Sequence, residues 1–135
     1  MTDDMKESKP KIITNIIHAN TFLSRLKGLM GRKTLPHDTG LLLEPCDNVH
    51  TFHMKFSIDV IFLNQENNVM HIEHSMKPNQ VGKKVKGAAK VLEINGGIAA
   101  AMNLQLGDVV DLVPRGEKRH ETKNKRKKKR VFTDL

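Results

Sequence analysis

The chain has 135 residues, of which 38% are hydrophobic, and it carries a formal net charge of +8 with no tryptophan or tyrosine. This length suits one domain with a real core, and no run of about 20 apolar residues, as a membrane helix needs, is present. The polar N-terminus lacks the apolar centre of a secretory signal, and one cysteine cannot form an internal disulfide, so we expect a soluble, cytoplasmic protein.

The first predicted element is a strand over residues 11–19. It follows a polar N-terminus, residues 1–10, that we expect to be disordered because its apolar content is low and Pro10 ends it. The sequence KIITNIIHA is rich in β-branched residues, which favour strands.

A helix is predicted over residues 21–32. Asn20 or Thr21 can cap its N-terminus through the side-chain oxygen. Gly28 inside a helix costs about 1 kcal/mol relative to alanine, so the helix is either short or closely packed at that point. One apolar stripe is formed by Phe22, Leu26, Leu29 and Met30.

The central segment, residues 41–64, contains two predicted strands with an irregular stretch between them. Residues 41–43 are a short apolar run that Pro45 ends. Residues 57–63 are β-branched and aromatic-rich, which is typical of a strand buried on both faces. Residues 46–54 mix thiol, imidazole and thioether groups without a clear period, and irregular segments held between strands often carry function.

The second half of the domain predicts further strands and one helix. A polar turn and the strand of residues 69–74 complete a hairpin with the strand of residues 57–63. The remaining elements are a long loop over 75–88, a strand over 89–94, a short helix over 98–103 and a last strand over 109–113. The fold class is therefore mainly β (α+β), an incomplete β-barrel or sandwich with two short helices over residues 11–114.

The basic residues gather in a tail, residues 115–135, whose ten basic and three acidic residues give a net charge of +7. The rest of the chain has a net charge of only +1, which is not typical of a nucleic-acid-binding domain. We expect the tail to be disordered, and either simply solvated or in non-specific contact with nucleic acid or an anionic surface. Its densest run is Lys125, Arg126, Lys127, Lys128, Lys129 and Arg130.

A metal site is one interpretation of the central segment. Cys46, His50 and Met54 are soft and borderline donors, which suit copper(I) best and zinc less well. If residues 50–54 are extended, His50 and Met54 face the same way. The set needs completion by a partner or by His18, His71 or His74. The alternative is a buried, inert cysteine.

A catalytic interpretation makes Cys46 a nucleophile with His50 as its base and Asp59 as the residue that orients the base. A carboxyl group in an apolar strand needs partners, and Arg25 or Lys55 can supply one for Asp59. Alternatively, Asp59 accepts a hydrogen bond from loop backbone and so holds the segment around His50 in shape. Glu93 either joins this cluster through space or faces outward from its strand.

Several of these motifs together carry a resemblance to a known family. They are Arg25–Met30 (RLKGLM), His50, Met54, Ile58-Asp59, Val91–Glu93 with Gly96, and Leu106–Val109. In this order they resemble the domain-of-unknown-function 192 family over about Ile12 to Val113. The resemblance implies a compact, mostly β fold with short helices and supplies no biochemical activity.

Three functional hypotheses follow. The first is a non-enzymatic binding module with a groove near residues 46–59 and the loop of residues 75–88, which holds a small ligand or peptide. The second is a metal-binding or thiol-dependent protein that uses Cys46 and His50. The third is association with nucleic acid through the tail. No cofactor is required by the sequence, and the site residues expected for the first hypothesis are Arg25, Cys46, His50, Met54, Asp59 and Glu93.

Overall fold

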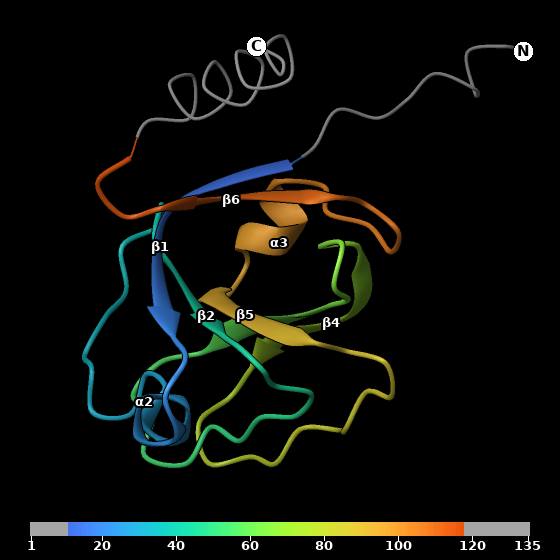
Figure 1. Ribbon diagram of the computed structural model, residues 1–135. Helices are drawn as coiled ribbons and strands as arrows, with labels where there is room; N and C mark the ends of the chain where they lie inside the picture. The colour runs from blue at the N-terminus through green and yellow to red at the C-terminus, as the bar shows by residue number, and fades with distance from the viewer. Residues whose placement is uncertain (1–10, 118–135) are drawn as a thin grey trace, which may run out of the picture.

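Six strands form one mixed open sheet with two short helices in the computed structural model, which describes residues 11–117 (Figure 1). The strand order is β4-β3-β5-β2-β1-β6. This confirms the mainly β fold, whereas the predictions for residues 1–10 and for the basic run of the tail lie outside the described residues. The elements are β1 (Lys11–Ala19), α2 (Phe22–Lys27), β2 (Gly40–Leu43), β3 (Ile58–Leu63), β4 (Val69–Met76), β5 (Lys90–Asn95), α3 (Ile98–Ala101) and β6 (Val110–Pro114).

Three long connections cover one face of the sheet. β1 is parallel to β2, whereas β2–β5, β5–β3 and β3–β4 are antiparallel, so β2 runs in the same direction as β3, and β4 as β5. Strands with a common direction cannot be joined by a tight turn. Residues 20–39, 44–57 and 77–89 therefore each cross the sheet, and we call these three segments the crossover layer. Figure 1 shows α2 and these loops on one side and α3 on the other.

The strands separate two apolar clusters. Leu41, Val60 and Phe62 face the crossover layer, where they pack with residues such as Leu29 and Met54. The opposite face presents a second cluster, which α3 covers through Ala99. Every residue of β3 is buried, which confirms the prediction of a strand covered on both faces.

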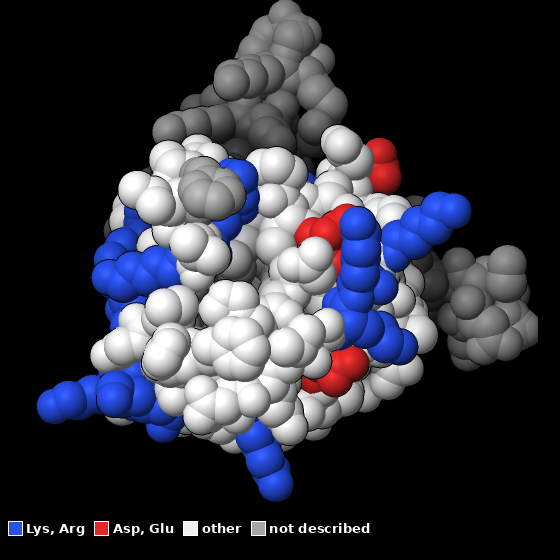
Figure 2. All heavy atoms as spheres, turned by 90° about the horizontal axis from the view of Figure 1, so that it is seen from below, with Lys and Arg blue, Asp and Glu red and all other residues white. Residues whose placement is uncertain are grey.

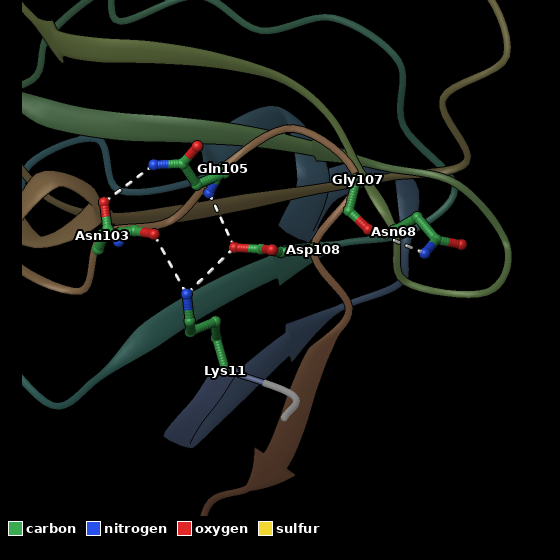
Figure 3. Close-up of polar contacts among 6 residues, drawn as sticks. All are labelled: Lys11, Asn68, Asn103, Gln105, Gly107 and Asp108. Atoms are coloured by element: carbon green, nitrogen blue, oxygen red, sulfur yellow. Dashed lines mark hydrogen bonds and ion pairs between the residues drawn. The ribbon is translucent and has the colours of Figure 1, made fainter. Parts of the chain in front are cut away.

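The two edges of the sheet meet at one corner. Asn68, in the β3–β4 turn, forms an isolated antiparallel bridge with Val109, and its side-chain amide donates to the carbonyl oxygen of Gly107 at 3.4 Å (Figure 3). Beside this bridge, the Lys11 ammonium pairs with the Asp108 carboxylate at 3.2 Å. The sheet thus curls toward an incomplete barrel and does not form a two-sheet sandwich.

The helices are shorter than predicted, and the strands agree better. Thr21 caps α2 in a reciprocal capping box with Ser24, but α2 ends at Lys27 because Gly28 adopts a positive φ of 50°. The prediction of a helix through Arg32 was therefore wrong. α3 ends two residues before its predicted end, and β4 extends two residues beyond its own. No helix within residues 11–117 is long and apolar enough to cross a lipid bilayer.

Asp59 fastens α3 and the end of β4 to the sheet. Its carboxyl group is fully buried on the face away from the crossover layer. One oxygen accepts the N–H of Ser75 at 2.8 Å, and the other accepts those of Gly97 and Ala99 at 3.0 and 2.8 Å. Of the roles predicted for Asp59, the structure shows hydrogen bonds to backbone and not a pairing with Arg25. The bonded N–H groups belong to Ser75, Gly97 and Ala99, so Asp59 does not hold the segment around His50 directly.

Replacing Asp59 with alanine should lower the free energy of unfolding by about 3–5 kcal/mol, because three backbone N–H groups lose a charged acceptor and that of Ala99 is buried. Urea unfolding followed by far-ultraviolet circular dichroism measures this loss. The matched control is Glu66→Ala, which removes an exposed carboxylate and should change stability by less than about 0.5 kcal/mol. Equal, small effects of the two substitutions would contradict the fastening role.

Candidate ligand pocket

A pocket of about 270 Å³ opens between the end of α2 and the segment that follows β2. We call it the Glu93 pocket, because Glu93 lines it from the middle of the sheet. Five of the six expected site residues line it, and only Asp59 does not. The lining residues are 25–30, Leu43, 45–50, Met54 and Glu93.

Glu93 is the most unusual group in this pocket. Its side chain is 3% exposed, and its Oε1 has no hydrogen-bond partner. Loss of solvation raises the pKa of Glu93 to about 8, so the carboxyl group is mostly protonated at neutral pH. Of the two positions considered for Glu93, the structure shows the one inside the cluster and not the outward-facing one.

Gly28 explains how the chain comes so close to Glu93. A Cβ atom at this position would lie 3.5 Å from Glu93 Oε1, and the positive φ of Gly28 is one that other residues rarely adopt. The early end of α2 therefore brings backbone, with no side chain, over the buried carboxyl group.

Cys46 contributes a thiol and not a thiolate. Burial raises the pKa of the Cys46 thiol, and the nearby Glu93 and Asp47 raise it further, although the hydrogen bond to Asn48 opposes this shift. Its Sγ donates to the Asn48 carbonyl oxygen at 3.0 Å. Because the thiolate is the reactive form, this environment does not favour nucleophilic chemistry.

His50 and Met54 reach the pocket by a different route from the one predicted. Residues 50–54 are not extended: His53 has a φ of 62°, and the Met54 N–H bonds the Thr51 carbonyl oxygen at 3.2 Å. The expectation of an extended segment was therefore wrong, although both side chains line the pocket. His50 Nδ1 accepts the N–H of Phe52 at 3.2 Å, and the two rings stack with centroids 5.0 Å apart.

Thr51 holds this segment in place and was missed in the sequence. It is fully buried, its hydroxyl donates to the Lys77 carbonyl oxygen at 2.6 Å, and the same oxygen accepts the N–H of Gln80 at 2.8 Å. The loop of residues 75–88 thus supports the pocket from outside and contributes none of its lining. A threonine in a polar stretch gives no signal in the sequence that would separate it from an exposed loop residue.

Arg25 and Asp59 do not act together. One Arg25 guanidinium nitrogen donates to the carbonyl oxygen of Asn20 at 3.0 Å, and Asp59 lies on the opposite face of the sheet. The structure therefore does not bring Asp59 to His50, as the catalytic interpretation requires.

The metal prediction stays a prediction. Cys46, His50 and Met54 line one pocket, but no group of three or more His, Cys, Asp or Glu side chains within residues 11–117 is placed to hold a metal ion. Two of the histidines proposed to complete the set are paired elsewhere, His18 with Glu44 and His71 with Glu73, each at 3.0 Å.

A second hollow is larger and more open, with a volume of about 540 Å³. It lies beside the loop of residues 33–37 and the start of β3, and its lining includes His37 and Asn95. These two side chains contact each other at 3.3 Å, so both already have a polar partner. In the Glu93 pocket a buried polar atom lacks a partner, and for this reason we place the candidate site there.

Fold and pocket together define a small open-sheet β protein with a buried carboxyl group beneath a layer of crossover connections. The chain belongs to the DUF192 family, described as "Uncharacterized ACR", whose model matches residues 4–112. This confirms the family to which the resemblance pointed. Part of the motif set of that resemblance meets in space. Arg25–Met30, His50, Met54 and Glu93 line the pocket, whereas Ile58-Asp59, Gly96 and Leu106–Val109 do not.

Relatives and solved structures agree with this assignment. The chain is 29% identical to a UPF0127 protein of Thermococcus sibiricus, over 79% of this chain and 72% of the relative. It is 30% identical to the UPF0127 protein TK1120 of Thermococcus kodakarensis, over 74% and 66%.

Two crystal structures share the fold, each with a TM-score of 0.65 over 70% of this chain. One is a protein of unknown function from Novosphingobium aromaticivorans, which is 29% identical and matched over 71% of its length. The other is described as a putative transcription regulator from Sinorhizobium meliloti, matched over 78% of its length; at 21% identity it supports the fold alone.

Glu93 should make stability depend on pH. The unfolded carboxyl group loses its proton near pH 4.5, whereas the folded one keeps it up to about pH 8. The folded state therefore binds more protons between these values, and stability should fall as pH rises, by at most about 1.4 kcal/mol per pH unit.

Glu93→Gln should flatten this fall and be more stable than the wild type at about pH 9. Urea unfolding across this pH range measures the difference, with Glu66→Gln as the exposed control. If the wild type and Glu93→Gln show the same pH profile, the carboxyl group does not titrate as described.

Proposed function

We propose that this protein is a small, non-enzymatic binding module whose Glu93 pocket takes a small ligand bearing an ammonium group. The observation that supports it is the buried Oε1 of Glu93, which has no hydrogen-bond partner. Buried polar atoms without a partner are uncommon in folded proteins and cost about 1–3 kcal/mol each. A ligand that donates an N–H to this oxygen removes that cost on binding.

An ammonium group suits this position better than a neutral donor. It donates an N–H to the Glu93 carboxylate and supplies the positive charge that balances the ionised form of this group. A charge-assisted hydrogen bond is about twice as strong as a neutral one. Leu29, Leu43 and Met54 supply apolar contacts for a short carbon chain.

The pocket contains no activated nucleophile. Cys46 is held as a thiol that donates to backbone, and Asp59, the one acidic residue predicted to assist it, is absent from the pocket. A pocket whose carboxyl groups are the buried Glu93 and the Lys84-paired Asp47, and which holds no activated nucleophile, is better suited to binding than to turnover.

We expect n-butylamine to bind in the pocket, and 1-butanol and butyrate, which have the same carbon chain, to bind more weakly. Because the ammonium group must displace the proton of Glu93, the affinity for the amine should rise about tenfold per pH unit from about pH 6 to the Glu93 pKa of about 8, and then level off. Backbone amide NMR titrations of the full chain measure the affinity and locate the shifts.

Glu93→Gln is the control variant, which should keep the fold and lose the preference for the amine. Shifts from butyrate that exceed those from butylamine would overturn the ammonium specificity, and an absence of localised shifts with all three probes would overturn the pocket itself. Titration with zinc and with copper(I) under reducing conditions tests the metal prediction on the same spectra.

A further inference from the structure

The charges of the folded part are strongly segregated, although their sum is small. The crossover layer contains nine basic and three acidic residues, whereas the rest of residues 11–117 contains three basic and seven acidic residues. Eight of the nine basic side chains are exposed, and Arg25 is half-buried. Within the described chain, the ion pair to a carboxylate that involves these nine is Lys84–Asp47, at 3.7 Å.

Figure 2 looks onto the crossover layer from below. Lys and Arg side chains project around the rim of this face, with a few Asp and Glu side chains among them on the right, and the rest of its centre is uncharged. Seven of the nine basic residues are lysines. Segments that are far apart in the sequence thus form one basic surface. The small net charge of the folded part does not reveal it, because most acidic residues lie elsewhere.

Exposed apolar side chains occupy the same layer. Leu23 and Leu26 on α2 are 73% and 54% exposed, and Val81 is 72% exposed. Phe52 is also exposed. Exposed large apolar residues that gather on one surface indicate an interaction site and not chance exposure.

These four side chains belong to one continuous area. His50 connects them: it lines the Glu93 pocket together with Leu26, pairs through its backbone with Val81, and stacks its ring on Phe52. Leu23 lies one helical turn before Leu26 on α2.

From this arrangement we propose that the crossover layer docks on an anionic lipid bilayer. Leu23, Leu26 and their neighbours enter the boundary between headgroups and acyl chains, and the surrounding lysines contact the lipid phosphates. Lysines around exposed apolar side chains are the pattern that anionic membrane surfaces attract.

The alternatives fit less well. A nucleic-acid surface is expected to present aromatic stacking platforms, and Phe52 alone among the exposed large hydrophobic residues is aromatic. An acidic protein partner matches the charge, but the four apolar side chains project from three separate segments, and of the four only Leu26 lines the Glu93 pocket. A bilayer requires no fixed spacing between inserted side chains.

The test uses the absence of tryptophan from the chain. Leu23→Trp places one fluorophore in the proposed contact, and Leu106→Trp places one at an equally exposed position outside the crossover layer, where Leu106 is 67% exposed. With vesicles of equal parts phosphatidylcholine and phosphatidylglycerol, the emission of Leu23→Trp should shift to the blue and that of Leu106→Trp should not. Vesicles of phosphatidylcholine alone should give no shift.

Vesicle sedimentation of two double variants provides the second measurement. Leu23→Ser with Leu26→Ser should lower the fraction bound to anionic vesicles by about tenfold or more, whereas Leu106→Ser with Val109→Ser should leave it unchanged. Every variant keeps the same basic tail, so the attraction of the tail to the vesicles is common to all.

Two results would overturn the proposal. In the first, Leu23→Ser with Leu26→Ser binds anionic vesicles like the wild type, while Lys83→Glu with Lys86→Glu binds them less. The surface then attracts anionic groups by charge alone, without insertion of apolar side chains, which favours an acidic protein partner. If all variants bind alike, the tail alone accounts for the attraction. Neither result bears on the Glu93 pocket, because amine binding is measured without vesicles.

Discussion

The direction of the strands is the constraint on which the rest of the structure depends. β1 and β2 are parallel neighbours, and β2 with β3 and β4 with β5 also share a direction, so three connections must return across the sheet. All three use the same face. This face therefore receives the irregular segments, the pocket and the segregated charge, while the opposite face holds α3 and a closed apolar cluster.

Two neighbouring carboxyl groups show how the faces differ. Asp59 and Glu93 lie on paired strands, with Asp59 opposite Ile94 and Glu93 opposite Val60. The side chains point to opposite faces because strand residues alternate. Asp59 meets three backbone N–H groups, whereas Glu93 Oε1 meets none. A buried carboxyl group thus holds backbone segments against one face of the sheet, and on the other face a second carboxyl group has an oxygen without a hydrogen-bond donor.

The strands could be predicted from the sequence because their β-branched runs are local signals. The length of α2 could not, since the conformation of Gly28 depends on its place over Glu93. For the same reason the sequence left the position of Glu93 undecided and gave no sign of Thr51, whose partners are 26 and 29 residues away. The grouping of basic residues was hidden because a net charge is summed along the chain, whereas the crossover layer assembles in space.

The described part of the chain begins on the side of the sheet away from α2. β1 starts at Lys11, and Figure 1 shows this position near α3, whereas the end of β6 at Pro114 pairs with Ile16, whose other neighbour is Gly40, directly after the first crossover segment. A group attached directly at Lys11 therefore leaves the side that carries α2 uncovered. Attached at that position, the protein would present its pocket and its basic surface away from the point of attachment.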